Sequence, residues 1–379
     1  MSRLENQLLE DLYAAYLMAR KGKRKSLEVH KFEMREMEEL EKLRDDILTR
    51  KYQTGVNTAF IIRDPVVREV FAAPFRDRVV HHYLYAKSAG WWDRRLSVDA
   101  YSCRVGKGTL YGQRRLMHHI ASVTKNYREQ AFVAKLDLQG YFMSLEHRRL
   151  YARVEWGLEQ QFRKKEEEEL KRTLKYLWKT VIFDQPAEKV QIKGKREDWR
   201  DLPRTKSLFY QPKGRGIAIG NLTSQLLSNI YLDQLDRFVT LNLGYKHYGR
   251  YVDDFYIVVP IEKKAQLLRD LKVIEDYIES LGLKLHPKKQ YKQIAEKGVP
   301  FLGAVVYPRR LIPGKRLRKN CSRALREMAE GRREIESAVS YLGHMEHMNS
   351  KKFLEKMFEE LGWRWEPEEN RFKAPNSKI

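Results

Sequence analysis

The sequence predicts a mixed α+β protein, and three observations support this fold class. Apolar residues recur at helical spacing near the amino end and again beyond residue 317. Between these regions, runs of aromatic and β-branched residues predict strands at residues 58–62, 131–137 and 248–259. A hydrophobic content of 42% and an aromatic content of 11% favour a folded chain over a disordered one. The length of 379 residues allows two or three domains, or one multi-lobed protein.

The charge balance indicates a polyanionic partner. The chain has 74 Lys and Arg residues against 51 Asp and Glu residues, which gives a formal net charge of +23. Nucleic acid is the simplest partner for such an excess, and an anionic membrane surface is the alternative. The most apolar central run, residues 255–261, is far too short to cross a bilayer. We therefore expect a nucleic-acid-binding protein with no membrane partner.

The cysteines and the amino terminus indicate where the protein works. With Cys103 and Cys321 alone, the sequence predicts neither a disulfide framework nor a Cys-rich zinc site. Residues 1–20 carry acids and bases among their leucines and lack the apolar core of a signal peptide. Both features favour a reducing, cytoplasmic location.

The amino-terminal part predicts two helices, at residues 4–18 and 27–48. The basic segment 21–25 between them could contact phosphate or could be a solvated loop. After the strand at residues 58–62, arginines punctuate a turn between two strand-like runs. Such a turn could clamp a triphosphate, because guanidinium groups donate bidentate hydrogen bonds to phosphate oxygens. Arg68 is the best single candidate, and ordinary surface ion pairs are the alternative.

Three features further along have a structural interpretation as well as a functional one. His81 and His82 lack a partner at metal-ligand spacing, so we expect them on a helix packing face. Trp91 and Trp92 are more typical of a core or a lobe junction than of a base-stacking platform. Residues 104–109 are basic and glycine-rich without the spacing of a Walker A loop, which predicts a loop near nucleic-acid backbone.

Tyr251-Val-Asp-Asp254 is the most informative stretch of the chain. Aromatic and β-branched residues flank two acids, the pattern of two strands that meet at a tight turn. Two adjacent carboxylates raise each other's pKa, and a hard cation such as Mg²⁺ relieves that repulsion. An acidic hairpin turn without a metal is the alternative.

A third carboxylate and a possible nucleotide loop favour the metal interpretation. Asp137 ends a predicted strand, and with Asp253 and Asp254 it completes a set that suits two-metal phosphoryl transfer. A cap or turn residue is the alternative for Asp137. Residues 213–225 form a Gly-rich loop whose Asn, Thr and Ser residues could cap the helix that follows. Gln225 could then bind a sugar or base, unless the loop merely precedes a core helix.

The remaining segments carry no predicted chemistry of their own. Residues 158–178 predict a solvated helix, and residues 184–203 a loop or a short hairpin. A helix at residues 262–280 and a hairpin at residues 298–306 follow the acidic turn.

Five motifs in this order resemble the palm of reverse transcriptases. They are the strand ending at Asp137, the Gly-rich loop with Ser-Gln, the Tyr-Val-Asp-Asp hairpin, Gly282-Leu-x-Leu-x-x-Lys-Lys289, and Phe301-Leu-Gly303. The resemblance runs from about residue 63 to residue 306. It implies a right-hand polymerase fold with fingers, a palm built on an antiparallel sheet, and a helical thumb. The expected domains are a helical extension at 1–55, fingers at 56–130, a palm at 131–310 with a fingers or insert segment at 155–215, and a thumb at 311–379.

The loop sequence resembles one subfamily in particular. Ile219-Gly-Asn-Leu-Thr-Ser-Gln225 is similar to the loop of reverse transcriptases from diversity-generating retroelements. Retroviral and group II intron enzymes typically carry a Pro-Gln-Gly type of loop instead. Pro65-x-x-Arg-Glu-Val and Phe75-Arg-Asp-Arg-Val-Val-His-His82 agree with the same subfamily. We also expect no appended RNase H or endonuclease domain, because the chain ends soon after the thumb.

The resemblance assigns roles to residues at matching positions. Asp137, Asp253 and Asp254, with Leu138 beside the first, would bind two Mg²⁺ ions, for which Mn²⁺ is a possible substitute. Asp253 would bridge both ions with Asp137, and Asp254 would be the lesser ligand. Phe142, five residues beyond Asp137, matches the steric gate that rejects a 2′-hydroxyl, although either ring of the Tyr141-Phe142 pair could belong to the core. The rest of the nucleotide site would comprise Arg68, Leu138, Tyr141, Ile219, Gln225 and Lys289, and the primer grip Phe301, Leu302 and Gly303.

The resemblance also implies partners and leaves some choices open. Lys288 remains an alternative to Lys289 as the lysine that protonates pyrophosphate. The expected partners are a structured template RNA, a primer or cDNA, and a small basic accessory protein that forms a ring, in a prokaryotic or phage-infected cell. Errors opposite template adenines are expected of the subfamily. Other prokaryotic reverse transcriptases (retron, abortive-infection or CRISPR-associated) and a catalytically silent RNA-binding scaffold are the alternatives, and the intact carboxylates argue against the scaffold.

Overall fold

The structure is a computed structural model that describes residues 3–64, 66–366 and 371–373. Pro65 of the arginine motif and residues 367–370 and 374–379 of the expected thumb lie outside the described residues. Contacts divide the chain into two units. The first unit contains Met1–Arg104, Asp137–Gly244 and Leu271–Pro287, and the second contains Val105–Leu136, Tyr245–Asp270 and Lys288–Ile379.

The first unit is mainly helical and is organised around α4. Its helices are α1 (Arg3–Arg20), α2 (Leu27–Glu33), α3 (Glu36–Leu48), α4 (Phe75–Asp93), α6 (Tyr141–Ser144), α7 (His147–Gln161), α8 (Glu168–Ile182), α9 (Leu222–Arg237) and the end of α10 (Lys264–Ser280). Helix α4 packs against α1, α2, α7, α8 and α9. Trp91 and Trp92 are buried at its carboxyl end, which confirms the core interpretation of this pair.

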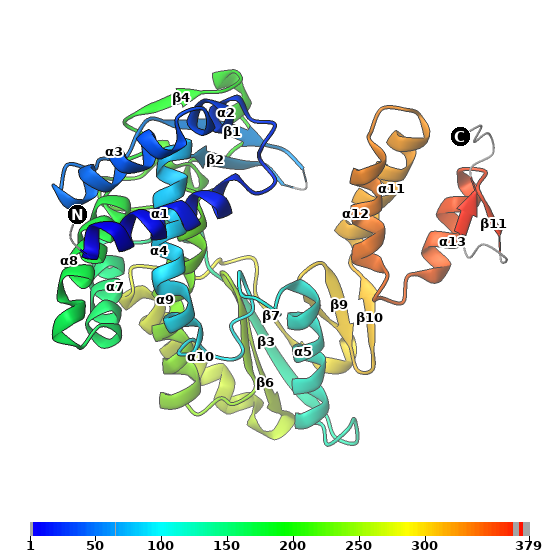
Figure 1. Cartoon of the computed structure of the whole chain (residues 1–379). Helices are drawn as coiled ribbons and strands as arrows, with labels where there is room; N and C mark the ends of the chain where they lie inside the picture. Colours follow the sequence, from blue (N-terminus) through cyan, green and yellow to red (C-terminus); the bar gives the residue numbers. More distant parts are fainter. Residues whose placement is uncertain (1–2, 65, 367–370, 374–379) are drawn as a thin grey trace. The chain divides into compact units, whose positions relative to one another are not determined.

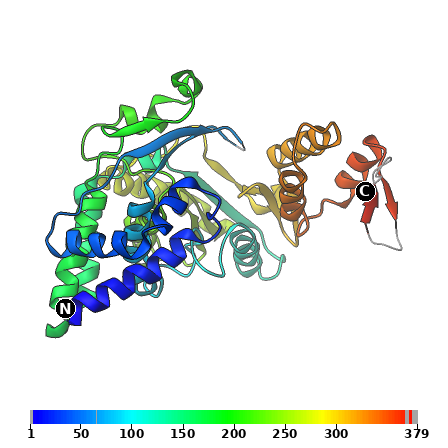
Figure 2. The same ribbon diagram turned by 45° about the horizontal axis from the view of Figure 1, so that its top comes forward.

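A three-stranded sheet lies beside these helices. Strand β1 (Asn57–Ile62) pairs antiparallel with β2 (Arg68–Ala72) and parallel with β4 (Val190–Ile192) (Figures 1 and 2). The expectation of a loop or hairpin at residues 184–203 is therefore wrong for its middle part. Strand β4 takes up backbone hydrogen bonds at the edge of β1, so the pairing depends on a segment that is distant in sequence.

Two predicted helices are each divided into two. The helix expected at 27–48 breaks at Arg35, which has φ −136° and ψ 38°. The break lets α2 bury Phe32 while α3 buries Leu40 and Leu43. The predicted solvated helix at 158–178 is wrong, because α7 ends at residue 161 and α8 begins at residue 168.

Helices α7 and α8 pack on each other with both an apolar and a charged contact. Leu174, Leu177 and Trp178 of α8 are fully buried. Lys171 and Lys175 reach Glu159 on α7 at 3.0 and 2.5 Å. The run of alternating charges therefore links two helices instead of facing solvent on one.

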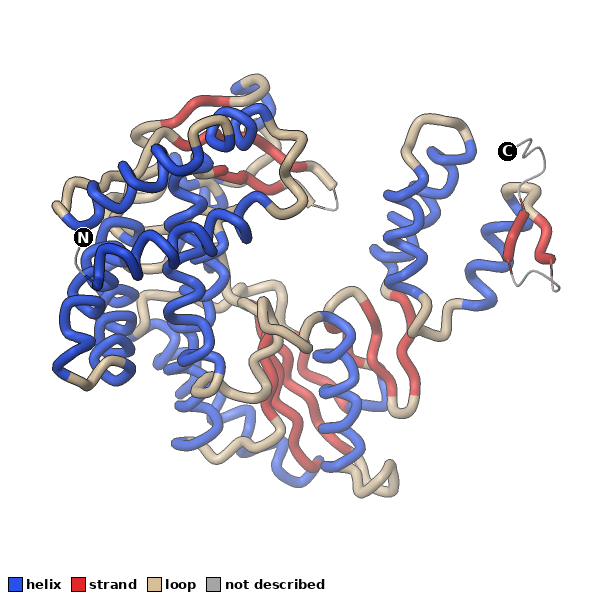
Figure 3. The backbone as a smooth tube through the Cα atoms, in the orientation of Figure 1, coloured by secondary structure: helices blue, strands red, loops and turns tan. Residues whose placement is uncertain are grey.

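The predicted strand at residues 58–62 is β1 of the first unit, and the other strand predictions are confirmed in the second unit. A four-stranded sheet has the order β5-β6-β3-β7 and is covered by α5 (Figure 3). A second sheet has the order β10-β9-β8, and a helical part ends in a small hairpin. The elements are α5 (Thr109–Val123), β3 (Ala131–Asp137), β5 (Tyr248–Tyr251), β6 (Asp254–Pro260), β7 (Tyr291–Ile294), β8 (Val299–Phe301), β9 (Ala304–Tyr307), β10 (Arg310–Pro313), α11 (Lys315–Ala329), α12 (Ile335–Met345), α13 (Lys351–Glu360), β11 (Arg364–Glu366) and β12 (Arg371–Lys373).

In the described part of the chain, no helix is both long and apolar enough to cross a membrane.

Candidate active site

The Tyr-Val-Asp-Asp stretch forms a tight turn between β5 and β6, as predicted. Tyr251 pairs with Asp254, so Val252 and Asp253 make the turn itself. Val252 has φ 56°, a left-handed conformation that β-branched residues rarely adopt. The side chain of Arg250 is fully buried, and its Nη1 donates a hydrogen bond to the Val252 carbonyl oxygen at 3.1 Å. This bond stabilises a strained turn that carries two acidic residues.

Asp254 already interacts with a cation of the protein. The Nζ of Lys135 donates to both carboxylate oxygens of Asp254, at 2.9 and 3.1 Å. The two side chains are only 15% and 18% exposed, so solvent screens their attraction little. Sequence reasoning missed Lys135. Its position two residues before Asp137 was the available signal, because alternate residues of a strand share a face.

Asp137 is the last residue of β3, the strand next to β6 in the sheet. It is 8% exposed, and the following Leu138 is 1% exposed. The backbone here is held by the Gly-Leu-x-Leu segment, because the His286 amide donates to the Asp137 carbonyl oxygen at 2.7 Å. Leu138 also forms an isolated bridge with Leu285. Two of the motifs named from the sequence are therefore in direct backbone contact.

The acidic turn of the second unit, with Asp253 and Asp254, suits a Mg²⁺ ion whose coordination substrate would complete. Their oxygens are the ligands that a hard cation prefers, and Asp254 binds an ammonium group through both of its oxygens. Among the described residues, no group of three or more His, Cys, Asp and Glu side chains is arranged to hold a metal by itself. Mg²⁺ commonly binds through one or two carboxylates with waters and substrate phosphates, so it does not require such a cage.

In the first unit, the rings of Tyr141 and Phe142 differ in how deeply they are buried. Tyr141 is 2% exposed, and its hydroxyl donates to the Ser228 carbonyl oxygen at 2.6 Å. Phe142 is half-buried at the edge of an apolar cluster. Of the two rings, Phe142 is thus the one with surface left to meet a ligand.

The other expected nucleotide residues of this unit lie on two segments joined by a backbone hydrogen bond. Arg68 is exposed at the start of β2. Gln225 is exposed on the first turn of α9, three residues after the helix begins. The amide of Phe71 on β2 donates to the carbonyl oxygen of Ile219 at 2.9 Å. Asn221 occupies the N-cap position of α9 but makes no side-chain cap hydrogen bond, so the expected capping role is wrong.

The primer-grip motif is a turn of the second unit. Phe301 is buried against Tyr256, with ring centroids 5.1 Å apart. Leu302 and Gly303 both have positive φ, at 51° and 84°. Gln113 of α5 is 1% exposed, and its amide donates to the Leu302 carbonyl oxygen at 2.9 Å, a contact that the sequence did not reveal. Lys288 and Lys289 are both exposed at the start of the last segment of this unit, and the register of the motif lysine stays a prediction.

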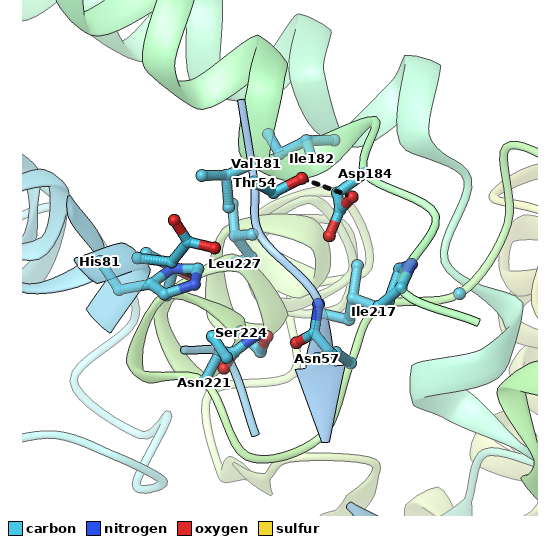
Figure 4. Close-up of a pocket in the computed structure, with 16 residues that line it drawn as sticks. Thr54, Asn57, His81, Val181, Ile182, Asp184, Ile217, Asn221, Ser224 and Leu227 are labelled. Carbon is cyan, nitrogen blue, oxygen red and sulfur yellow. Dashed lines mark hydrogen bonds between the residues drawn. The ribbon is translucent and has the colours of Figure 1, made fainter. Parts of the chain in front are cut away.

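A small pocket of the first unit is lined in part by the loop that leads into α9, through Ile217 and Asn221 (Figure 4). Residues from β1, α4, the end of α8 and the loop after it, and the start of α9 line it, including Asn57, Asp77, His81, Asp184 and Thr223. Burial raises the pKa of Asp77 and of Asp184. His81 is 5% exposed on α4, which confirms the packing-face prediction for this histidine, and its Nδ1 shares a hydrogen bond of 2.8 Å with the Thr223 hydroxyl.

His81 should make stability depend on pH. Burial, with the nearby positive charges of His82 and Arg78, lowers the pKa of His81 to about 3. An unfolded chain binds this proton near pH 6.5, so native stability should fall as pH drops from about 6.5 towards 3. Urea unfolding at pH 7 and pH 5 should show a loss that is about 2 kcal/mol smaller in His81→Gln than in the wild type. The exposed His30→Gln is the control, and identical losses in all three proteins would refute the assignment.

Among the comparisons with known proteins, a family model covers the region that carries these motifs. No curated protein matches the chain. A chain of the Candida albicans telomerase structure, solved in complex with the TWJ fragment of telomeric RNA, is 12% identical, with a TM-score of 0.49. The match covers 83% of this chain and 55% of that one, so this chain spans about half the length of the telomerase chain. Residues 99–306 match the family described as Reverse transcriptase (RNA-dependent DNA polymerase), more than half of the sequence. The fold is the expected α+β right-hand polymerase fold, and the chain belongs to the reverse transcriptase family.

Proposed function

We propose that the protein copies RNA into DNA by two-metal nucleotidyl transfer. The observation that carries this proposal is the acidic turn at Asp253 and Asp254, on the strand next to the one that ends at Asp137. These three carboxylates would hold two Mg²⁺ ions, with the Leu138 backbone beside them. Bound there, the ions would lower the pKa of the primer 3′-hydroxyl and neutralise charge on the triphosphate and the leaving pyrophosphate.

The side chains of the chain have separate tasks in this reaction. Arg68 would bind the triphosphate, and Gln225 would contact the incoming nucleotide. Phe142 would exclude a 2′-hydroxyl, and Lys289 would donate a proton to pyrophosphate. Lys135 would balance the charge of Asp254, as the bidentate contact between them supports.

Arg250 should act by holding the turn, so its loss should lower kcat. Arg250→Met removes the hydrogen bond to the strained Val252 carbonyl and would let the carboxylates move. We expect kcat to fall about tenfold with little change in KM, since small displacements of reacting groups are costly. Single-turnover primer extension measures this, with thermal melting to confirm folding. A well-folded Arg250→Met enzyme with wild-type kcat would contradict the role, and Arg250→Lys should recover part of the loss.

The loop sequence supports a narrower proposal. Ile219 to Gln225 resembles the loop of diversity-generating retroelement enzymes, so we propose a template-repeat RNA as substrate and errors opposite adenine. Ile219, whose carbonyl oxygen ties its loop to β2, and Gln225, on the first turn of α9, would contact the nascent base pair. The net charge of +23 supports binding of RNA and cDNA. A small basic ring-forming protein is the proposed partner, and the cytoplasm the proposed location.

Primer extension tests the function and the subfamily together. The assay combines the protein with Mg²⁺, then Mn²⁺, dNTPs and an adenine-containing RNA template, with and without candidate accessory proteins. DNA with errors concentrated opposite adenine is the expected product. Accurate cDNA would retain the polymerase and remove the retroelement assignment. Tight RNA binding without any product would favour a silent scaffold.

A further inference from the structure

We propose that Glu69 is a positioning residue for the incoming nucleotide. Its buried carboxylate ties the segment at residues 196–208 to β2, the strand that begins with Arg68. The inference rests on the proposed polymerase function, and all of the residues that carry it belong to the first unit.

Glu69 is the centre of a compact set of hydrogen bonds. The residue is 1% exposed, and its Oε2 accepts from Trp199 Nε1 and from Ser207 Oγ, both at 2.7 Å. Its Oε1 accepts from the backbone amide of Leu208 at 2.6 Å. A buried carboxylate is costly unless donors surround it, and hydrogen bonds to an ionised group are stronger than neutral ones. Three donors from a distant segment therefore fix β2 to residues 199–208.

Strand β4, just before this segment, is attached to β1, and the segment itself is attached to the turn that follows β1. Strand β4 pairs with β1, from Asn57 opposite Val190 to Ala59 opposite Ile192. Arg63, just past the end of β1, forms ion pairs with Asp198 at 3.3 Å and Asp201 at 3.0 Å. These exposed pairs contribute little alone. Together with the hydrogen bonds of Glu69, these ion pairs and the β4 pairing attach both β1 and β2 to residues 190–208.

Residues 190–208 also pack against residues that would surround a nucleotide. Leu208, beside the Glu69 contacts, belongs to an apolar cluster with Phe71 and Ala218, and Phe142 and Ile219 pack on its edge. Gly220 fits closely here, since a Cβ on it would lie 2.9 Å from the Phe71 carbonyl oxygen. Arg68 and Glu69 point to opposite faces of β2, the first exposed and the second buried. Loosening Glu69 should therefore displace the nucleotide contacts and leave the acidic turn in place.

Glu69→Gln tests this directly, because an amide presents one acceptor and one donor group where three donors point. We expect the Kd of a labelled non-hydrolysable dNTP for the enzyme–template–primer complex, and the KM for dNTP, to rise about tenfold. The kcat and the Kd for RNA should stay within about twofold. Trp199→Phe and Ser207→Ala each remove one donor and should raise KM less. Their effects should not add to that of Glu69→Gln, since all act through one network.

Asp77→Asn is the matched control. Asp77 is 2% exposed and accepts from the Tyr52 hydroxyl at 2.9 Å and the Gly55 amide at 2.7 Å. It should lower the melting temperature as Glu69→Gln does, without raising the nucleotide Kd. A nucleotide Kd that is unchanged in Glu69→Gln, or raised equally in Asp77→Asn, would overturn the role of Glu69. Nucleotide binding is measured without turnover, so it tests the role of Glu69 even if the wild type makes no DNA. A wild type that makes no DNA would instead refute the proposed function.

Discussion

Asp253→Asn should abolish DNA synthesis while the protein still binds RNA. The substitution keeps the shape of the turn and removes the charge that a metal-binding site needs. We expect the rate of primer extension to fall by about a thousandfold, as when roughly 4 kcal/mol of transition-state stabilisation is lost. The Kd for template RNA should change by no more than about twofold, because lysine and arginine contacts to phosphate dominate affinity. Gel-based extension and fluorescence anisotropy at fixed salt measure the two quantities.

Asp276→Asn is the control for this experiment. Asp276 lies on α10, its side chain is 62% exposed, and it pairs with Lys272 at 3.2 Å. The substitution therefore removes a carboxylate of the same kind from a surface position. Its extension rate should equal that of the wild type. Synthesis that persists in Asp253→Asn would remove this residue from the metal site. Loss of RNA binding would show that the turn supports the nucleic-acid surface instead.

The sequence predicts elements whose evidence is local. The strand before Asp137, the acidic hairpin and the helix after the Gly-rich loop all depend on patterns within about a dozen residues, which side-chain periodicity records. It did not predict contacts between distant segments. Lys135 meets Asp254 across 119 residues, and Glu69 meets Trp199 across 130.

The errors have the same physical origin. Periodicity did not place the break at Arg35, because a bend there depends on which surfaces the two shorter helices bury. Strand β4 has half-exposed, mixed side chains, and its strand character comes from the edge of β1 rather than from its own residues. Arg250 is one charged residue within an aromatic strand, and the sequence alone does not reveal that the Val252 carbonyl is its acceptor.

Phe142→Ala should weaken the preference for deoxyribonucleotides. Of the two adjacent rings, Phe142 is half-buried and Tyr141 is 2% exposed, so a 2′-hydroxyl would meet the ring of Phe142. Removing it should lower the ratio of kcat/KM for dNTP over rNTP by about a hundredfold, on the order of 3 kcal/mol, mainly through faster rNTP incorporation. Single-nucleotide extension with matched dNTP and rNTP measures this ratio.

Tyr141→Phe provides the matched comparison at the neighbouring position. It keeps the ring and removes only the hydroxyl that donates to the Ser228 carbonyl oxygen at 2.6 Å. Losing that buried hydrogen bond should cost about 1 kcal/mol of unfolding free energy and leave the nucleotide ratio unchanged. If Tyr141→Phe changed the ratio and Phe142→Ala did not, the gate would be on the buried side of the pair and α6 would have to turn when nucleotide binds. The opposite result, which we expect, would show that burial of the Tyr141 ring against α9 orients Phe142 towards the sugar.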